Sequence, residues 1–96
     1  MALKLQITDA RGVITRWHKI TGCQVEWPTG RGQTPWVAVT IRSWVNQAQR
    51  DQETRDGIDT SVATRGVAIP MPDVITLTGL YTAIKQLPDW VDAEDC

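Results

Sequence analysis

The most regular feature of this sequence is an alternation of apolar and other side chains between Trp36 and Val45. Apolar β-branched residues stand at positions 37, 39, 41 and 45, and they alternate with Trp36, Thr40, Arg42 and Trp44. Successive side chains of a β-strand point to opposite faces of its sheet, so a period of two indicates a strand. We therefore predict a strand whose valine and isoleucine face belongs to the core, with Trp36 and Trp44 on the opposite face.

The N-terminal part of the chain predicts a hairpin and its continuation. Residues 3–8 alternate strictly, with leucine and isoleucine facing inward, and Asp and Gly stand at the first and last positions of a predicted turn at 9–12. Residues 13–21 are rich in β-forming types and predict the returning strand of the hairpin. A short strand follows at 23–27, and Gly22 between the two predicts a bulge or bend.

The second half predicts a loop, one more strand and a helix. Two glycines and two prolines in residues 28–35 predict a loop. Residues 58–69 predict a strand, which the prolines within 70–72 end because they carry no N–H. Apolar residues recur at positions 77, 80, 81 and 84, which is the spacing of one helix face, and Thr76 is the predicted N-cap. The helix is expected to end near residue 87, before a proline.

A polar segment interrupts the predicted strands. Residues 46–57 contain one alanine and no larger apolar residue, so they cannot bury a face against a core. The segment is compatible with a solvated helical turn, the tip of an extended hairpin or a mobile arm. With 96 residues, we predict a single domain over 1–96 with 46–57 as a polar arm or loop within it. The predicted fold is α+β, a small antiparallel sheet of about five strands, sandwich- or barrel-like, closed by one C-terminal helix.

Charge and hydropathy exclude several kinds of partner. The formal net charge is −1, so the chain as a whole lacks the positive excess that attracts nucleic acid or anionic lipid. No apolar run approaches the roughly 18 residues that a membrane helix needs. Residues 1–10 lack the continuous apolar stretch of a signal peptide. We therefore expect neither a nucleic-acid partner nor a membrane partner.

Residue types that carry catalysis or bind metals are scarce. The one histidine, His18, has only Ser43 and Ser61 as serine partners, and neither serine lies in a nucleophile-elbow pattern. We interpret His18 as a half-buried strand residue. Cys23 and Cys96 do not form the closely spaced pairs of a zinc site, and we expect two free thiols. The sequence predicts no enzyme activity, no metal site and no cofactor.

Tryptophan is the unusual residue type, with five copies against one tyrosine and no phenylalanine. Five indoles in so small a core cannot all be buried with their N–H groups hydrogen-bonded. Because Trp and Arg are typical anchors of protein interfaces, we predict that an exposed Trp36 and Trp44 form a contact surface with Arg42. The candidate interface residues are Trp17, Arg31, Trp36, Arg42, Trp44, Arg50 and Arg55. The alternatives are that both faces of the sheet are covered, or that the tryptophans form a sugar-binding platform.

The order of these motifs resembles that of a known class of proteins. A Thr-Arg-Trp-His-Lys-Ile strand at 15–20 precedes a Val-x-Val-x-Ile-x-Ser-Trp strand at 37–44, and an Ile-Pro strand end follows at 69–70. The chain closes with Leu-Tyr-Thr-Ala-Ile-Lys-Gln-Leu-Pro-Asp-Trp at 80–90, the most specific part of the pattern. This order is similar to that of small structural proteins encoded in the tail and baseplate gene blocks of tailed bacteriophages. The segment 46–57 matches least well.

The resemblance implies a non-enzymatic structural component of a virion, in the tail, baseplate or neck, that is made in the host cytoplasm. Such a subunit assembles through sheet edges and Trp/Arg contacts with other virion proteins, and with copies of itself in a symmetric ring. Two alternatives stay open. One is an intracellular assembly factor or adaptor that is absent from the mature particle, and the other is a carbohydrate-binding module.

Overall fold

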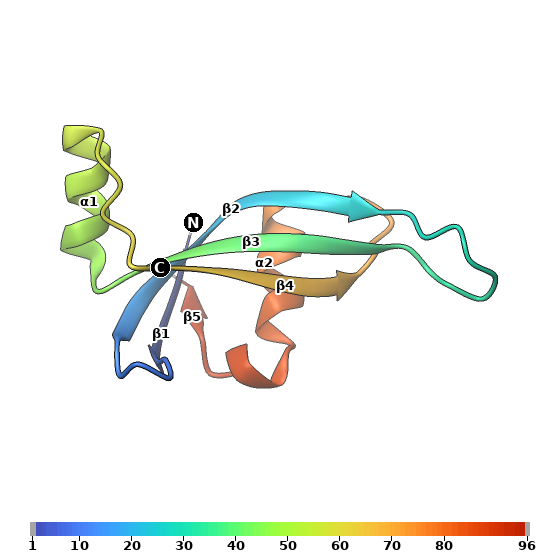
Figure 1. The fold of residues 1–96 in the computed structure, drawn as a ribbon, viewed down its shortest axis with the longest axis horizontal. Helices are drawn as coiled ribbons and strands as arrows, with labels where there is room; N and C mark the ends of the chain where they lie inside the picture. Colours follow the sequence, from blue (N-terminus) through green and yellow to red (C-terminus); the bar gives the residue numbers. More distant parts are fainter. Residues whose placement is uncertain (1, 96) are drawn as a thin grey trace.

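The computed structural model describes residues 2–95, which form a five-stranded antiparallel sheet with two α-helices. Across the sheet, the strands follow the order β4 (Ala63–Pro70), β3 (Trp36–Trp44), β2 (Ile14–Glu26), β1 (Leu3–Thr8) and β5 (Glu94–Asp95). The helices are α1 (Gln47–Asp56), between β3 and β4, and α2 (Leu77–Lys85), which is followed by the short 3₁₀ helix η1 (Pro88–Trp90). Figure 1 shows α2 on one side of the sheet and α1 beyond one end of it.

The predicted α+β class and antiparallel sheet are confirmed, but the predicted closure is wrong. The strands form one open sheet, not a sandwich or a barrel. Residues 2–95 also contain two α-helices instead of one, because the polar segment 46–57 forms α1. Asn46 caps the start of α1 by accepting a hydrogen bond from the Gln49 N–H at 3.0 Å. Gly57 ends the helix with a φ of 71°, a left-handed conformation that glycine adopts without steric strain.

Two predicted strands are one strand in the structure, and another is shorter than predicted. β2 continues through Gly22, where its register against β3 shifts, so the predicted bulge is confirmed. β4 begins at Ala63 and not at Ile58, because Ser61 donates both its N–H and its hydroxyl to the Asp59 carboxylate in a local turn. β5, in the acidic C-terminal tail, has no counterpart in the sequence prediction.

The predicted turn, loop and helix cap agree with the structure. The Gly12 N–H donates to the Asp9 carbonyl at 3.0 Å and closes the turn between β1 and β2. Residues 28–35 contain neither helix nor strand. Thr76 caps α2 by accepting a hydrogen bond from the Gly79 N–H at 3.0 Å. Local chemistry thus sets the boundaries of these elements.

The core lies between α2 and the face of the sheet that it covers, here called the inner face. On β3, the inner-face residues Val37, Val39 and Ile41 are at most 1% exposed. The core cluster comprises Leu3, Ile20, Val37, Val39, Ile41, Ile69, Leu80, Tyr81, Ile84 and Trp90. Trp90, on η1, belongs to this cluster and packs against it from the C-terminal side of α2.

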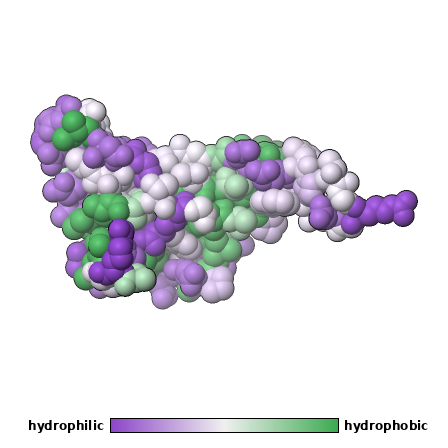
Figure 2. Space-filling view, in the orientation of Figure 1, coloured by the Kyte–Doolittle hydropathy of each residue, from purple (hydrophilic) through white to green (hydrophobic). Residues whose placement is uncertain are grey.

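The molecule is elongated, with principal extents of 45 × 26 × 23 Å. The loop over residues 28–35 and helix α1 project from opposite ends of the central sheet (Figure 1). Both projections are mostly hydrophilic, whereas hydrophobic residues gather between them (Figure 2). The two ends of the elongated molecule therefore carry polar extensions that contribute little to the core.

Tyr81 connects α2 to the irregular part of β2. Its hydroxyl accepts a hydrogen bond from the Ile20 N–H at 2.9 Å, beside the point where the register of β2 shifts. Both residues are buried, so this backbone donor has no access to water. An unsatisfied buried donor is costly, and Tyr81 therefore makes the bulge compatible with a covered sheet.

We expect Tyr81→Phe to lower the free energy of unfolding by roughly 1–3 kcal/mol, because it leaves the Ile20 N–H buried without that acceptor. Denaturant unfolding measures the loss, and native-state hydrogen exchange should show a faster Ile20 amide. Thr82→Ala, at an exposed neighbour on α2, is the control and should change stability by less than about 0.5 kcal/mol. Equal exchange at Ile20 in the Tyr81 variant and the parent would contradict this role.

His18 is fully buried on the inner face, not half-buried as predicted. Its Nε2 lies 2.7 Å from the Leu5 carbonyl oxygen, and its Nδ1 lies 2.7 Å from Ser43 Oγ. A carbonyl can only accept, so Nε2–H donates to Leu5 and Nδ1 accepts from the Ser43 hydroxyl. The Trp90 ring meets the imidazole edge to face, with 5.1 Å between centroids. The two hydrogen bonds of His18 thus join β2 to β1 and to β3.

The protonation of His18 should make stability depend on pH. Burial, and to a smaller extent the charge of Arg65, lowers the pKa of His18 from its ordinary 6.5, although the hydrogen bond to Leu5 opposes the shift. The unfolded chain therefore binds a proton that the folded chain excludes, and stability should fall as the pH drops below 6.5. Urea unfolding between about pH 7 and 5 measures this slope. The slope should be shallower in His18→Gln, and an unchanged slope would assign it to other groups.

Candidate functional site

The predicted interface residues Trp17, Arg42, Trp44 and Arg50 meet where α1 leaves the sheet, a region that we call the α1 junction. Trp17 and Trp44 are partners on neighbouring strands, and their rings meet edge to face with centroids 5.7 Å apart. The Arg42 guanidinium lies 4.9 Å from the centroid of Trp44, and that of Arg50 lies 5.5 Å from the centroid of Trp17. These distances are those of cation–π contacts.

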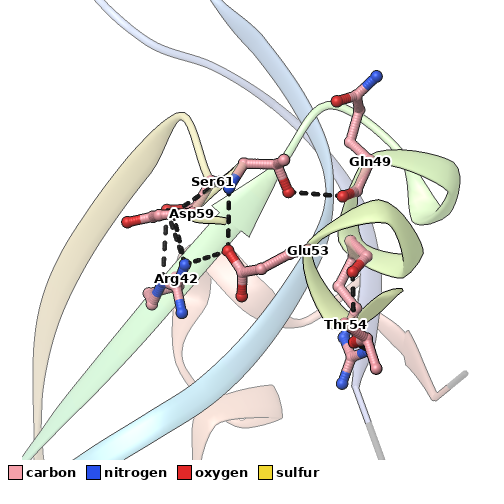
Figure 3. A network of polar contacts seen from close by, with 8 residues as sticks. Arg42, Gln49, Glu53, Thr54, Asp59 and Ser61 are labelled. Carbon is pink, nitrogen blue, oxygen red and sulfur yellow. Dashed lines mark hydrogen bonds and ion pairs between the residues drawn. The ribbon is translucent and has the colours of Figure 1, made fainter. Parts of the chain in front are cut away.

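Arg42 is the centre of the polar network that holds α1 (Figure 3). Its Nη2 donates to the carboxylates of both Glu53 on α1 and Asp59 on the segment that follows it. Glu53 also accepts a hydrogen bond from the Thr60 N–H at 3.0 Å, and Thr60 in turn donates its hydroxyl to the Gln49 carbonyl. The network joins β3, α1 and the return to β4, so it fixes the position of a helix that has no buried residue.

The charges in this network are stabilised by one another. Hydrogen bonds from the hydroxyl and N–H of Ser61, together with that from Arg42, lower the pKa of Asp59 to about 2. Partial burial works against the charge of Arg42, but the carboxylates of Glu53 and Asp59 outweigh it and raise the pKa of Arg42. Asp59 and Arg42 are therefore both ionised at neutral pH, and the arginine donates to the carboxylates of Asp59 and Glu53 together.

A cavity of about 320 Å³ opens beside the junction. Its lining residues are Lys4, Arg16, Trp17, Asn46 and Gln47. Within residues 2–95, neither Lys4 nor Arg16 forms an ion pair, and the same holds for Arg50 above the Trp17 ring. This end of the molecule therefore carries three cationic residues without an ion pair among the described residues, although the register places Glu94 of β5 opposite Lys4.

The predicted exposed pair of Trp36 and Trp44 is wrong for Trp44. Trp44 is only 1% exposed, because Trp17 and Arg42 pack against its ring where the chain turns into α1. Trp36 is 40% exposed at the other end of β3, about 26 Å away at the rise of a strand. Both lie on the outer face as predicted, but they cannot act as one surface. The Trp44 Nε1 is buried and has no hydrogen-bond partner among the described residues.

The remaining predicted residues lie away from the junction. Arg31 is exposed on the projecting loop over residues 28–35, and Arg55 pairs with Asp56 at the end of α1. Trp27, which is 67% exposed at the end of β2, was not among the predicted interface residues although it is the most exposed tryptophan. The molecule therefore has two separate aromatic regions at opposite ends of the sheet. One contains Trp17 and Trp44, and the other contains Trp27 and Trp36.

Sequence reasoning missed Lys4 and Arg16 as members of the junction. Lys4 is the cross-strand partner of Trp17, but the register of β1 against β2 shifts between Lys4 and Ile7. An irregular register cannot be read from alternation alone, since alternation gives the face of a residue and not its neighbour. The pairing of Lys4 with Trp17 therefore could not be predicted from the sequence pattern.

Comparison with family models, curated proteins and solved structures finds no match to this chain. Within residues 2–95, no three or more His, Cys, Asp or Glu side chains are grouped so that they could hold a metal ion. Neither described helix is long and apolar enough to cross a bilayer. Cys23 is a free, exposed thiol, whereas Cys96 lies outside the described residues.

The position of α1 should depend on the charge of Glu53. Glu53→Gln removes one of the two ionised partners of Arg42, and we expect stability to fall by about 1 kcal/mol, because both side chains are partly exposed to screening solvent. Trypsin should then cleave after Arg50 and Arg55 severalfold faster than in the parent chain.

Asp51→Asn is the matched control for this experiment. Asp51 is exposed on the same helix and forms no ion pair within the described residues. Its variant should therefore be cleaved after Arg55 at the rate of the parent, and the bond after Arg50 is left out of this comparison because residue 51 is part of that cleavage site. Equal acceleration in the Asp51 and Glu53 variants would show that general helix charge, and not the contact with Arg42, holds α1.

Proposed function

We propose that this chain is a non-enzymatic structural subunit of a tailed-phage virion, and that it binds a neighbouring subunit through the α1 junction. The observation that carries the proposal is the group of unpaired cations, Lys4, Arg16 and Arg50, around Trp17 beside a cavity. The similarity of motif order to tail and baseplate proteins supplies the setting. The partner suited to this surface is a protein segment that presents acidic side chains.

Several side chains of the junction are already held in place before any partner binds. Arg50 is placed over the Trp17 ring, and Asn46 is fixed as the cap of α1, so less side-chain entropy remains to be lost on binding. Trp and Arg are the residue types that most often dominate interface energy. Positive charges without partners also accelerate the approach of an acidic surface.

The shape of the molecule supports contacts at two ends. The junction lies at one end of the 45 Å axis, and the exposed Trp36 lies toward the other. β4 is the edge strand of the sheet on its side, so one row of its backbone groups lacks a strand partner within the described chain. A subunit with separate surfaces of this kind suits repeated assembly around an axis, where each copy meets two neighbours.

The same geometry gives less support to a carbohydrate-binding module. A sugar platform needs exposed indole faces, and the junction lacks them because Trp44 is buried and Arg50 lies over one face of Trp17. The exposed indoles, Trp27 and Trp36, lie at the other end of the molecule. An assembly factor that is absent from the finished particle would use the same junction, and only its location distinguishes it from a virion subunit. The test below therefore measures location and contact together.

Quantitative mass spectrometry of purified particles from the source phage should find this chain at a fixed ratio to the major capsid protein. Arg16→Glu reverses one charge of the junction and should lower incorporation by about tenfold. Arg11→Glu, at an exposed arginine in the turn between β1 and β2, is the control. It removes the ion pair of Arg11 with Asp9 but no contact of the junction, so a folded variant should be incorporated normally.

Two outcomes would contradict the proposal. If the chain occurs in the infected-cell lysate and not in particles, it is an assembly factor and not a virion subunit. Normal incorporation of folded Arg16→Glu would instead exclude the junction as the contact surface. Circular dichroism of both variants separates loss of contact from loss of fold.

A further inference from the structure

A second cavity, of about 500 Å³, lies on the inner face of the sheet beyond the part that α2 covers. It is bounded by β1, β4 and the segment around η1. The residues that matter for its chemistry are Leu5, Ile7, Arg65, Asp89, Trp90 and Asp92. This volume is within the range of pockets that hold small organic ligands, and none of these residues belongs to the α1 junction.

Arg65 places at this cavity a positive charge that forms no ion pair with the described residues. The register pairs Arg65 with Ile41, so its side chain projects from the inner, core-forming face of the sheet. Its Nη2 donates to Thr15 Oγ1 at 3.2 Å, and its Nε is buried without a hydrogen-bond partner. No carboxylate among residues 2–95 lies within 4.0 Å of it. A partly buried guanidinium in this state favours an anionic partner.

The C-terminal side of the same cavity carries the opposite charge. Asp89 and Asp92 line it and form no ion pair within residues 2–95. The buried Trp90 and the partly buried Leu5 and Ile7 also line the cavity and offer apolar contact. The cavity therefore combines one cationic group, two carboxylates and an apolar surface.

We propose that this cavity binds a zwitterionic ligand, in which a carboxylate and a cationic nitrogen flank an apolar group. The planar guanidinium of Arg65 suits a carboxylate, because its N–H groups form a fork that matches two oxygens. Asp89 and Asp92 attract the cation and repel ligands of purely negative charge, such as phosphate. An amino acid with an apolar side chain has this chemistry, and so does a peptide segment with an acidic, an apolar and a basic residue.

His18 supplies a built-in reporter of an occupied site. The positive charge of Arg65 contributes to the lowered pKa of His18, although burial is the larger cause. A carboxylate bound to Arg65 offsets this charge, so the pKa of His18 should rise when the site is filled. Trp90 lines the cavity and also contacts the His18 ring, so its indole resonance reports the same event independently.

The test is an NMR titration of the full chain with L-leucine, monitored at the Trp90 indole and the His18 imidazole. Two matched probes lack one charge each: 4-methylpentanoate has no ammonium group, and 3-methylbutylamine has no carboxylate. We expect leucine to bind about tenfold more tightly than either probe, with inorganic phosphate weaker still. The peptide acetyl-Glu-Leu-Lys-amide distinguishes the two sources of this chemistry, since it carries both charges on side chains.

Arg65→Met removes the guanidinium charge and leaves an unbranched apolar side chain in place of the arginine stem. It should weaken binding of leucine by about tenfold. Arg31→Met, at an exposed arginine of the distant loop, is the control and should bind like the parent chain. A second variant, Asp89→Asn with Asp92→Asn, changes only exposed side chains and keeps the test valid if Arg65→Met fails to fold. It should remove the preference for leucine over 4-methylpentanoate.

Preferred binding of leucine or of the peptide over the single-charge probes, lost in these variants, supports the proposal. Equal binding of leucine and 4-methylpentanoate to the parent would overturn it, as would no shift at Trp90 or His18 with leucine and with the peptide. The Arg16→Glu variant should bind these probes normally. A failure of this site and a failure of the virion contact are therefore separate results.

Discussion

Strand β3 contributes to the hydrophobic core with one face and to the α1 junction with the other, and the remaining elements pack around it. Its inner face supplies Val37, Val39 and Ile41 to the core under α2. Its outer face supplies Arg42 and Trp44 to the α1 junction. Because the period of a strand is two residues, a shift of one position would exchange these sets and abolish both the core and the junction. The packing of the core and the position of the proposed contact surface therefore have one common origin.

The two α-helices are held in different ways. α2 buries Leu80, Tyr81 and Ile84, so its position follows mainly from apolar packing, supported by the Ile20–Tyr81 hydrogen bond. An exposed ion pair between Lys85 and Asp95 also joins α2 to β5. α1 buries no residue, and its position follows from its caps, from Arg42 and from the contact of Arg50 with Trp17. Salt screens the ion pairs that hold α1 and has little effect on the apolar packing that holds α2. The contacts at the α1 junction are thus more sensitive to solution conditions than the core is.

Much of the fold can be predicted from the sequence because its signals are local. Alternation identifies the strands, Gly22 marks the bulge, and Thr76 marks the start of α2. Local signals fail where distant residues decide the outcome. No periodic pattern shows that Arg42 recruits Glu53 and thereby stabilises a polar helix, or that Trp17 and Arg42 cover Trp44.

The candidate site was likewise only partly predictable. Its Trp and Arg residues were identified by type, because these residue types are typical of interfaces. Their division into two regions follows from the length of β3, which separates Trp36 from Trp44. The place of Lys4 beside Trp17 depends on an irregular register, and the charge of Arg65 on the inner face breaks the expected apolar pattern of that face.

Because α1 is inserted between β3 and β4 and buries no residue, the segment that can contact a neighbour is separate from the core that stabilises the fold. The ladder between these strands already closes at Ser43 and Ala63, so the residues between them form the enlarged tip of a hairpin. The length and chemistry of such a tip can change while the sheet beneath it keeps its register. A protein built in this way can acquire a new neighbour by altering one polar segment, and its hydrophobic core need not change with it.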